Sequence, residues 1–331
     1  PKVGYYFSKE PFGKNGDFIT SPVISNLFSE IVGIWLVSTW EKIGKPKIFN
    51  FVELGPGDGS LTKVIISTLK KFPELNRAIK IYLYEKSVFL KKLQKQNIDN
   101  KRIKWIKNFN SVKKGPVIFF GNEFFDAIPI KQFSNINNEL FEKYYSVKDN
   151  VDIIEKFIRG NKKDIAQIMT FGTLKKLKFI EFPKKGLIEL NPIIKKINKL
   201  SGGILLIDYG YLNSNNSNTI QAVMDNKKIS TETMLKNLGK ADITSLVNFN
   251  LLKEYFLKNN LKVKKVVTQR FFLERMGIIE RAHILEKKRT NEEQKYMKET
   301  LSRLLEEKQM GSLFKVIFGY KNKNNNFFGF E

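Results

Sequence analysis

The 331-residue sequence contains no cysteine and a single histidine, His283. Without cysteine the chain forms no disulfide, has no thiolate metal ligand and no cysteine nucleophile, which is compatible with a reducing compartment. A single histidine argues against multi-histidine metal sites and histidine-dependent triads, so we expect His283 on a helix surface or at a core edge and no metal site. No apolar run is long enough to cross a bilayer, and no signal peptide is visible. The first residue is Pro1 rather than Met, so we expect a trimmed or partial chain.

Negative charge is also scarce: 33 Asp and Glu stand against 58 Lys and Arg, a formal net charge of +25. Such an excess suits a nucleic acid, an anionic membrane surface or an acidic protein partner. However, the lysines are scattered, few arginines accompany them, and Lys, Asn and Ile are abundant together, as in A/T-rich codons. Nucleic-acid-binding proteins usually cluster their charge and favour Arg. We therefore attribute the charge to codon composition and expect no nucleic-acid partner.

One glycine-rich stretch organises the rest of the chain. Residues 48–54 are largely apolar, β-branched or aromatic and predict a buried strand. Gly55, Gly57 and Gly59 follow at every second position, and residues 61–69 then have a helical pattern. Glycine permits a tight turn and close approach to a ligand, and helix N-terminal amides point at a bound group. This strand, turn and helix predict a nucleotide site.

The glycine spacing and a neighbouring carboxylate indicate which nucleotide. G-x-G-x-G differs from the dinucleotide fingerprint G-x-G-x-x-G, and the stretch lacks the lysine of a P-loop. Glu53 lies two positions before Gly55 and suits a ligand that carries positive charge. S-adenosylmethionine, with its sulfonium and α-amino group, is such a ligand and is the cofactor we predict. The alternative is a glycine-rich turn without a ligand.

Glu85 is a second candidate contact for this ligand. It follows a predicted strand at residues 79–84, about 30 positions after Gly55. Nucleotide-binding folds place a ribose at this point, and a carboxylate can accept hydrogen bonds from both ribose hydroxyls. The alternative is a surface glutamate, but the register with the glycine turn favours ribose binding.

Polar residues also follow the predicted strand at residues 115–121. Asn122, Glu123 and Asp126 come at its carboxyl end, where open α/β sheets bind their ligands. Two phenylalanines, Phe124 and Phe125, lie between them. The alternative is a capped turn with both rings in the core, but the clustering of polar groups favours a functional site.

The alternation of strand and helix patterns predicts an α/β fold with insertions. We expect an N-terminal segment at residues 1–45 that covers the donor site, a core at 46–129 and 201–321, an inserted substrate or partner subdomain at 130–200, and a tail at 322–331, of which residues 322–326 are expected to fray. Further elements are predicted within these parts: strands at 103–106, 140–147, 151–157, 187–190, 203–207, 261–267 and 310–318, and helices at 88–96, 192–200, 251–258, 274–287 and 292–307.

Several segments together resemble the MidA-type (DUF185) S-adenosylmethionine-dependent methyltransferases, a family whose mitochondrial members are complex I assembly factors. The motifs are G-Y-Y at 4–6, G-D-F-I-T-S-P at 16–22, E-L-G-P-G-D-G-S-L at 53–61, N-E-F-F-D-A-I-P at 122–129, I-D-Y-G-Y at 207–211, T-I-Q-A-V at 219–223, G-K-A-D-I-T at 239–244 and M-G-S-L-F-K-V at 310–316. E-L-G-P-G alone is shared by many methyltransferases, whereas the second and fourth motifs in that order are far more specific.

The chain departs from the family pattern at four positions. Val23 stands where the family usually has Glu, and Asn226 where His is usual. Leu246 and Asn248 stand where His and Asp are common. These departures bear on catalytic strength or substrate fit and not on the fold.

The resemblance implies a class I (Rossmann-like) methyltransferase sheet with a strand-rich insertion after the fourth core strand and extra helices. It implies protein arginine methylation on a 49-kDa-type subunit of respiratory complex I, with a role in its assembly. The location would be the cytoplasm of a bacterium, or the mitochondrial matrix of a eukaryote. The oligomeric state stays open.

The same resemblance suggests roles for the candidate residues. Gly16, Asp17, Thr20 and Ser21 would fold over the donor, although turn and cap chemistry alone could account for Asp17 and Thr20. Carboxylates must localise the charge of an arginine acceptor, and Glu123 and Asp126 are the candidates, with Asn122 positioning the acceptor and Phe124 or Phe125 stacking on it.

Two other classes of function are compatible with the sequence. In a nucleic-acid methyltransferase, Asn122 would correspond to the Asn of an N-P-P-[FY] motif and the basic charge would suit RNA. However, Glu123 stands where proline is usual, and an acidic site edge repels phosphates. The other class is a non-catalytic assembly or binding protein that retains the fold, which the substitutions at Val23 and Asn226 suggest.

Overall fold

A nine-stranded sheet forms the centre of the computed structural model, which describes residues 26–148, 152–213, 215–225, 227–287 and 289–331. Seven of its strands have the order β14-β16-β9-β4-β1-β2-β3. The two others pair outside this order, β13 with β9 and β15 with β16. The parallel strands are β1 (Phe49–Leu54), β2 (Ile79–Tyr84), β3 (Ile103–Ile106), β4 (Val117–Asn122) and β9 (Gly202–Tyr211). The long β16 (Phe314–Lys321) lies antiparallel to β9. This mostly parallel sheet confirms the predicted Rossmann-like α/β fold.

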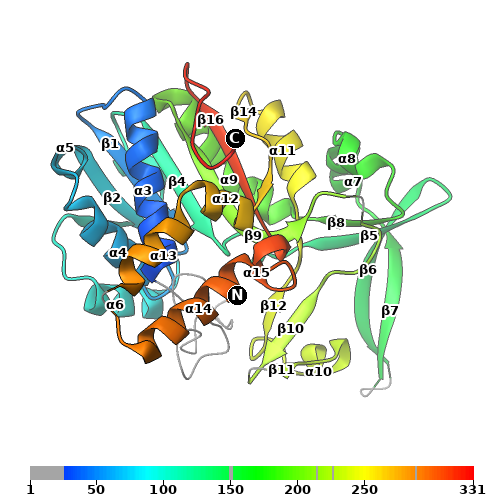
Figure 1. The fold of residues 1–331 in the computed structure, drawn as a ribbon. Coiled ribbons are helices and arrows are strands. Elements are labelled where there is room, and N and C mark those ends of the chain that lie inside the picture. Colours follow the sequence, from blue (N-terminus) through cyan, green and yellow to red (C-terminus); the bar gives the residue numbers. More distant parts are fainter. Residues whose placement is uncertain (1–25, 149–151, 214, 226, 288) are drawn as a thin grey trace.

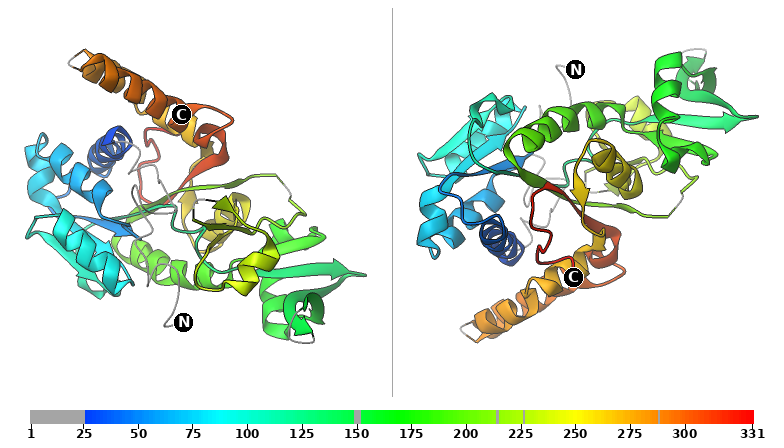
Figure 2. Two further views of the ribbon diagram at one scale, coloured as in Figure 1. Left: turned by 90° about the horizontal axis from the view of Figure 1, so that it is seen from below. Right: turned by 90° about the horizontal axis from the view of Figure 1, so that it is seen from above.

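Helices cover both faces of the sheet because its strands are apolar on both sides (Figures 1 and 2). Every residue of β1 is buried. One core contains side chains of α3 (Asn26–Lys42), α4 (Ser60–Leu69), α12 (Gln269–Arg275), α13 (Ile278–Glu286) and α14 (Asn291–Leu305). The opposite core contains side chains of α9 (Lys184–Leu200) and α11 (Phe249–Lys258). Two shorter helices, α5 (Pro73–Ala78) and α6 (Val88–Asn97), flank β2 in the chain.

Some predicted elements near the C-terminus have different bounds. The predicted strand at 261–267 is two short strands, β14 (Lys262–Val263) and β15 (Val267–Thr268), both paired with β16. The single helix predicted at 274–287 is broken at Gly277, whose φ of 81° ends one helix and begins the next. The predicted strand at 310–318 begins with a helical turn, α15 (Met310–Leu313). His283 is exposed on α13, as expected.

The predicted strand-rich insertion forms a separate four-stranded antiparallel sheet beside the core (Figure 1). Its order is β7 (Asp152–Arg159), β6 (Glu139–Lys148), β5 (Lys131–Ile136) and β8 (Phe179–Phe182), and α7 (Lys162–Ile168) and α8 (Gly172–Lys175) connect β7 to β8. The strand predicted at 187–190 is wrong, because these residues lie within α9, which packs on β4 and β9. We therefore propose that the insertion ends near residue 183 and that α9 belongs to the core.

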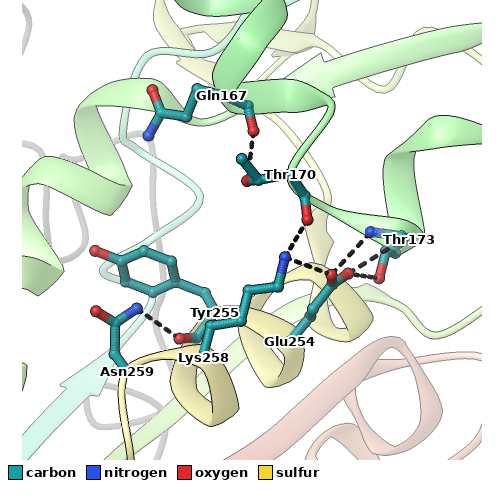
Figure 3. Close-up of polar contacts among 8 residues, drawn as sticks. Gln167, Thr170, Thr173, Glu254, Tyr255, Lys258 and Asn259 are labelled. Carbon is teal, nitrogen blue, oxygen red and sulfur yellow. Dashed lines mark hydrogen bonds and ion pairs between the residues drawn. The ribbon is translucent and has the colours of Figure 1, made fainter.

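Helix α11 of the core holds the insertion through a cluster of polar contacts (Figure 3). The Glu254 carboxylate accepts hydrogen bonds from the backbone amides of Gly172 (2.8 Å) and Thr173 (2.9 Å) and from the Thr173 hydroxyl (2.6 Å). Lys258 pairs with Glu254 at 3.0 Å and donates to the carbonyl of Thr170. Partial burial alone would raise the pKa of Glu254, but these hydrogen bonds outweigh it and lower the pKa to about 2.

A third, small sheet has the order β11 (Lys227–Lys228), β10 (Gln221–Met224) and β12 (Asp242–Thr244), with α10 (Thr231–Lys236) between β11 and β12. It follows β9 in the chain and lies between the core and the insertion in the view of Figure 1. The short β13 (Val247–Asn248) then returns to the main sheet beside β9.

Beyond residues 322–326, where fraying is predicted, the C-terminal tail packs on the core. Phe327 and Phe330 are buried, with ring centroids 5.0 and 6.0 Å from that of Phe318. The Asn324 amide donates to the carbonyl of Lys42 at 3.1 Å. Within the part of the chain that the structure describes, no helix has the length and apolar character required to span a membrane.

Candidate functional site

A cavity of about 270 Å³ lies at the carboxyl ends of β1, β2 and β4. These three strands are neighbours in the sheet, so the residues that follow them meet at one edge. Most of the predicted site residues within the described ranges line this cavity, namely Glu53, Gly55, Gly57, Glu85, Asn122, Glu123 and Asp126. The predicted residues Gly16, Asp17, Thr20 and Ser21 lie outside the described residues.

The glycine turn requires backbone conformations that other residues rarely adopt. Gly55, Gly57 and Gly59 have φ angles of 62°, 55° and 86°, in the left-handed region. A Cβ at Gly55 would lie 3.3 Å from the Phe124 ring, and one at Gly59 would lie 2.6 Å from Ile98. Gly59 is adjacent to lining residues without lining the cavity, so its part in binding stays a prediction. Gly55 and Gly57 line the cavity without a side chain, so a larger residue at either position would reduce the volume of the cavity.

Glu53 lines the cavity and is buried, with 4% of its surface exposed. The Thr62 hydroxyl, on the first turn of α4, donates a hydrogen bond to its carboxylate. Burial disfavours the charged form and raises the pKa of Glu53 to about 8, although the Thr62 bond acts in the opposite direction. A cation in the cavity would favour the ionised form.

Glu85 is held at the end of β2 by two hydrogen bonds. It accepts from the Ser87 amide at 2.7 Å and from the Gln94 side chain at 3.2 Å, and burial raises its pKa. Gln94 also donates to the carbonyl of Gly57 at 2.8 Å, so one side chain joins Glu85 to the glycine turn. Sequence reasoning missed Gln94 and Thr62. Gln94 could have been noticed because it is an uncharged side chain in a helix that is rich in lysine.

The turn after β4 has an unusual backbone. Glu123 has a φ of 50°, which costs a non-glycine residue free energy, and its amide donates to the carbonyl of Ile207 at 2.9 Å. The Asn122 side-chain amide donates to the Glu123 carboxylate at 3.1 Å. The Oδ1 atom of Asn122 is buried and has no hydrogen-bond partner among the described residues. Phe124 lines the cavity, whereas Phe125 is 4% exposed and packs in the core, so Phe125 is not placed to stack on a ligand.

Asp126 lies beside two residues of β9 that the sequence motifs contained but did not single out. Burial raises its pKa to about 6, and the Tyr209 side chain hydrogen-bonds to it and acts in the opposite direction. Asp208 is 1% exposed and accepts hydrogen bonds from the amides of Phe125 (2.8 Å), Asp126 (3.2 Å) and Tyr209 (3.0 Å). Burial, followed by the nearby Asp126 charge, raises the pKa of Asp208. Asp208 therefore fixes the turn that carries Glu123 and Asp126.

The cavity is acidic although the chain is strongly basic. Seven side chains with a carboxyl group line it: Glu53, Asp58, Glu85, Glu123, Asp126, Glu189 and Asp242. Among the described lining residues the one cation is Lys86, which pairs with Glu189 of α9 at 2.5 Å, while the Tyr84 hydroxyl donates to the same carboxylate at 3.0 Å. Such a lining attracts cationic ligands and repels phosphates. Sequence reasoning missed Glu189 because it assigned these residues to a strand.

Two of the four residues that depart from the family pattern, Leu246 and Asn248, lie within the described ranges. Asn248 caps α11, since its side chain accepts from the Leu251 amide at 3.0 Å, and it hydrogen-bonds to the Tyr211 side chain. Leu246 and Asn248 line a second, small hollow and not the main cavity. Val23 and Asn226 lie outside the described residues. In the described ranges no group of three or more His, Asp or Glu side chains is arranged to hold a metal ion.

A parallel sheet with a glycine turn after its first strand, an acidic residue after its second and an acidic lining defines a class I methyltransferase site. Residues 31–267 match the family described as "Putative S-adenosyl-L-methionine-dependent methyltransferase", and the chain belongs to this family. The predicted family and the predicted methyl donor, S-adenosylmethionine, are thereby confirmed.

Named relatives and a solved structure agree with this membership. A Caenorhabditis elegans protein, "Protein arginine methyltransferase NDUFAF7 homolog, mitochondrial", is 30% identical over 344 residues, which cover 96% of this chain and 79% of that protein. The Xenopus laevis protein arginine methyltransferase NDUFAF7 is 28% identical over 340 residues, covering 95% and 77%. A Burkholderia thailandensis structure bound to S-adenosyl-homocysteine has a TM-score of 0.81 at 18% identity, covers 99% of this chain and 86% of its own, and shows the shared fold.

Proposed function

We propose that this methyltransferase transfers a methyl group from S-adenosylmethionine to an arginine side chain of a protein. The observation that carries the proposal is the acidic cavity, in which seven carboxylates line one space within a chain of net charge +25. Neither codon composition nor burial explains carboxylates gathered at this one edge. The names of the relatives support the choice of arginine.

The donor half of the cavity would hold the cofactor, which supplies an electrophilic methyl group on a sulfonium. The turn at Gly55 and Gly57 would receive the methionine part, because a side chain at Gly55 would crowd the space against Phe124. Glu53 would face positive charge of the donor, and Glu85 would accept the ribose hydroxyls, since Ser87 and Gln94 already fix its carboxylate. The residues present therefore fit this donor.

The acceptor half would hold the guanidinium of arginine, which is always protonated and is a poor nucleophile. Glu123 and Asp126 would accept its N–H groups and orient one nitrogen toward the donor. The buried Oδ1 of Asn122 offers a further acceptor, and Phe124 offers an aromatic face. The methylated nitrogen must lose one proton, and Asp126, with a pKa of about 6, is suited to accept it near neutral pH.

The test separates donor binding from transfer. Calorimetry would measure the affinity for S-adenosylmethionine, and mass analysis would detect methylation of an arginine peptide. Gly57→Val, which forces a β-branched residue to a φ of 55°, is expected to abolish donor binding. Glu123→Gln should keep donor binding and lose transfer. Glu139→Gln, an exposed glutamate of the insertion, is the matched control and should change neither.

Two results would overturn these assignments. Unchanged donor affinity in Gly57→Val would remove the donor site from the glycine turn, and full transfer by Glu123→Gln would remove Glu123 from the acceptor site. A wild-type protein that does not bind the donor would instead favour a non-catalytic assembly protein.

The identity of the protein substrate rests on the family resemblance. We propose a 49-kDa-type subunit of respiratory complex I, in the mitochondrial matrix of a eukaryote or the cytoplasm of a bacterium. Labelled methyl donor in a lysate that lacks the enzyme would test this proposal, because the added protein should label that subunit. Label on RNA would favour a nucleic-acid methyltransferase.

A further inference from the structure

Asp242 reaches the cavity from a part of the chain remote from the other acceptor candidates. It begins β12 of the small sheet and pairs there with Val223 of β10. It is 3% exposed and lines the same cavity as Glu123 and Asp126, more than a hundred positions earlier in the sequence. Its motif, G-K-A-D-I-T, had no role in the sequence-based site.

The backbone around β12 fixes Asp242 relative to the acceptor turn. The Ser245 amide, just after β12, donates to the carbonyl of Asp126 at 3.3 Å. The Thr244 side chain hydrogen-bonds to Tyr209, whose side chain in turn bonds to Asp126. One direct hydrogen bond from Ser245 and one path through Tyr209 therefore connect this segment to Asp126, the residue that we propose as a contact of the substrate.

The number and origin of the carboxylates match a particular shape of cation. A guanidinium is planar and presents five N–H groups in a fixed fork, whereas an ammonium is a compact point charge. Glu123 and Asp126 come from the turn after β4, and Asp242 comes from β12 of the small sheet. Carboxylates from two separate elements that line one cavity can contact different N–H groups of one planar cation.

We infer that Asp242 is a third carboxylate of the acceptor site and that it determines the preference for a guanidinium over a neutral group of the same shape. This inference rests on the proposed arginine methylation. It adds a contact that binds and orients the substrate, while Glu123 and Asp126 keep the roles proposed above.

The experiment compares two peptides with the full-length protein. One peptide carries arginine and the other carries citrulline, a neutral isostere, at the same position. Calorimetry in the presence of S-adenosyl-homocysteine gives the dissociation constant of each. The wild type should prefer arginine at least about 10-fold, and Asp242→Asn should reduce the affinity for the arginine peptide by about 10- to 100-fold, the loss expected for a charge-assisted hydrogen bond.

Controls separate binding from folding. Asp242→Asn should keep its affinity for S-adenosyl-homocysteine within twofold of the wild type, which shows an intact donor half. Glu232→Gln, an exposed glutamate on α10 of the same small subdomain, should change nothing. If Asp242→Asn fails to fold, Asp242→Glu keeps the charge but displaces it by one methylene, and it should still lower the preference for arginine.

The outcomes distinguish the inference from the function on which it rests. If the wild type prefers arginine and the Asp242 variants keep the full preference, the inference is wrong and the proposed function stands. If the wild type does not distinguish the two peptides, both fail. If Asp242→Asn loses as much affinity for S-adenosyl-homocysteine as for the arginine peptide, Asp242 acts in the donor half or supports the fold. That result would also overturn the inference.

Discussion

The affinity for S-adenosylmethionine should rise steeply with pH because of one buried carboxyl group, Glu53. Burial raises the pKa of this group to about 8, and the Thr62 hydroxyl offsets only part of the effect. At pH 6 the carboxyl is therefore neutral, and at pH 9 it is ionised. If the cationic donor binds the ionised form, binding must first remove a proton, and the cost of removal falls as pH rises.

The magnitude follows from the ionised fraction. With a pKa of about 8, about 1% of the group is ionised at pH 6, about 9% at pH 7 and about 90% at pH 9. If Glu53 faces the permanently charged sulfonium of the donor, and not the α-amino group, which itself titrates near pH 8, the dissociation constant should therefore fall about 90-fold from pH 6 to pH 9, equivalent to about 2.7 kcal/mol. A carboxyl with the ordinary pKa of about 4.3 would give almost no change over this range.

Calorimetric titration with S-adenosylmethionine from pH 6 to pH 9 tests this expectation. Repeating each titration in two buffers of different ionisation enthalpy gives the number of protons released, which should approach one per site at pH 7. Glu53→Gln is the control, because it keeps the acceptor for Thr62 but has no proton to lose, and its profile should lack the 90-fold change.

The thermal stability of Glu53→Gln shows whether a change in its binding profile comes only from unfolding of the variant. The folded pKa of Glu53 lies above its unfolded value, so its contribution is most favourable below about pH 4.3 and is lost as pH rises through 8. Glutamine does not ionise, so the variant should melt no lower than the wild type at pH 8. A flat wild-type binding profile, or an equally steep profile in Glu53→Gln, would refute the reasoning.

Two further predictions concern carboxylates that hold other segments in place: Asp208, which binds the turn after β4, and Glu254, which binds the insertion. Asp208→Asn places an amide among three backbone donors, so we expect a loss of about 1–3 kcal/mol in the free energy of unfolding and a larger fall in transfer rate than in donor affinity. Denaturant titration and kinetics would measure both, and an unchanged transfer rate would argue against this role. Glu254→Gln should weaken the hold on the insertion by about 1 kcal/mol at pH 7. Because the pKa of Glu254 is lowered to about 2, its stabilisation is present above about pH 4.3 and is lost as pH falls toward 2, so unfolding curves of variant and wild type should converge in acid.

The residues of the proposed donor half could be brought together from sequence because they lie in consecutive elements. A buried strand, a glycine turn and a helix are consecutive, and Glu85 ends the next strand. Local patterns therefore determine both the elements and the edge of the sheet at which they meet. The structure places Glu53, Gly55, Gly57 and Glu85 around one cavity, as the pattern predicted.

The acceptor half could be predicted only in part, because it depends on contacts between distant segments. Glu123 and Asp126 follow a recognisable strand, but Asp242 lines the cavity from the small sheet, and Asp208 reaches the turn after β4 because β9 lies beside β4. No local pattern specifies which strand lies beside which.

The wrong strand prediction at residues 187–190 has a local cause. Over residues 187–190 the apolar spacing is too short to distinguish a strand from a helix, and the helical period emerges only when Ile193, Ile194 and Ile197 are included. The packing of Phe327 and Phe330 was not predicted, because it depends on a tertiary contact with Phe318.

The different chain origins of the two halves of the cavity bear on how substrate preference can evolve. The donor half is formed by residues 53–94, whereas Asp242 and the contacts that fix it come from β9 and the small sheet. Substitutions in the small sheet can therefore alter which side chain is accepted without disturbing the glycine turn. A lineage could exchange one acceptor for another while retaining its donor, and related chains that bind the same donor need not share a substrate.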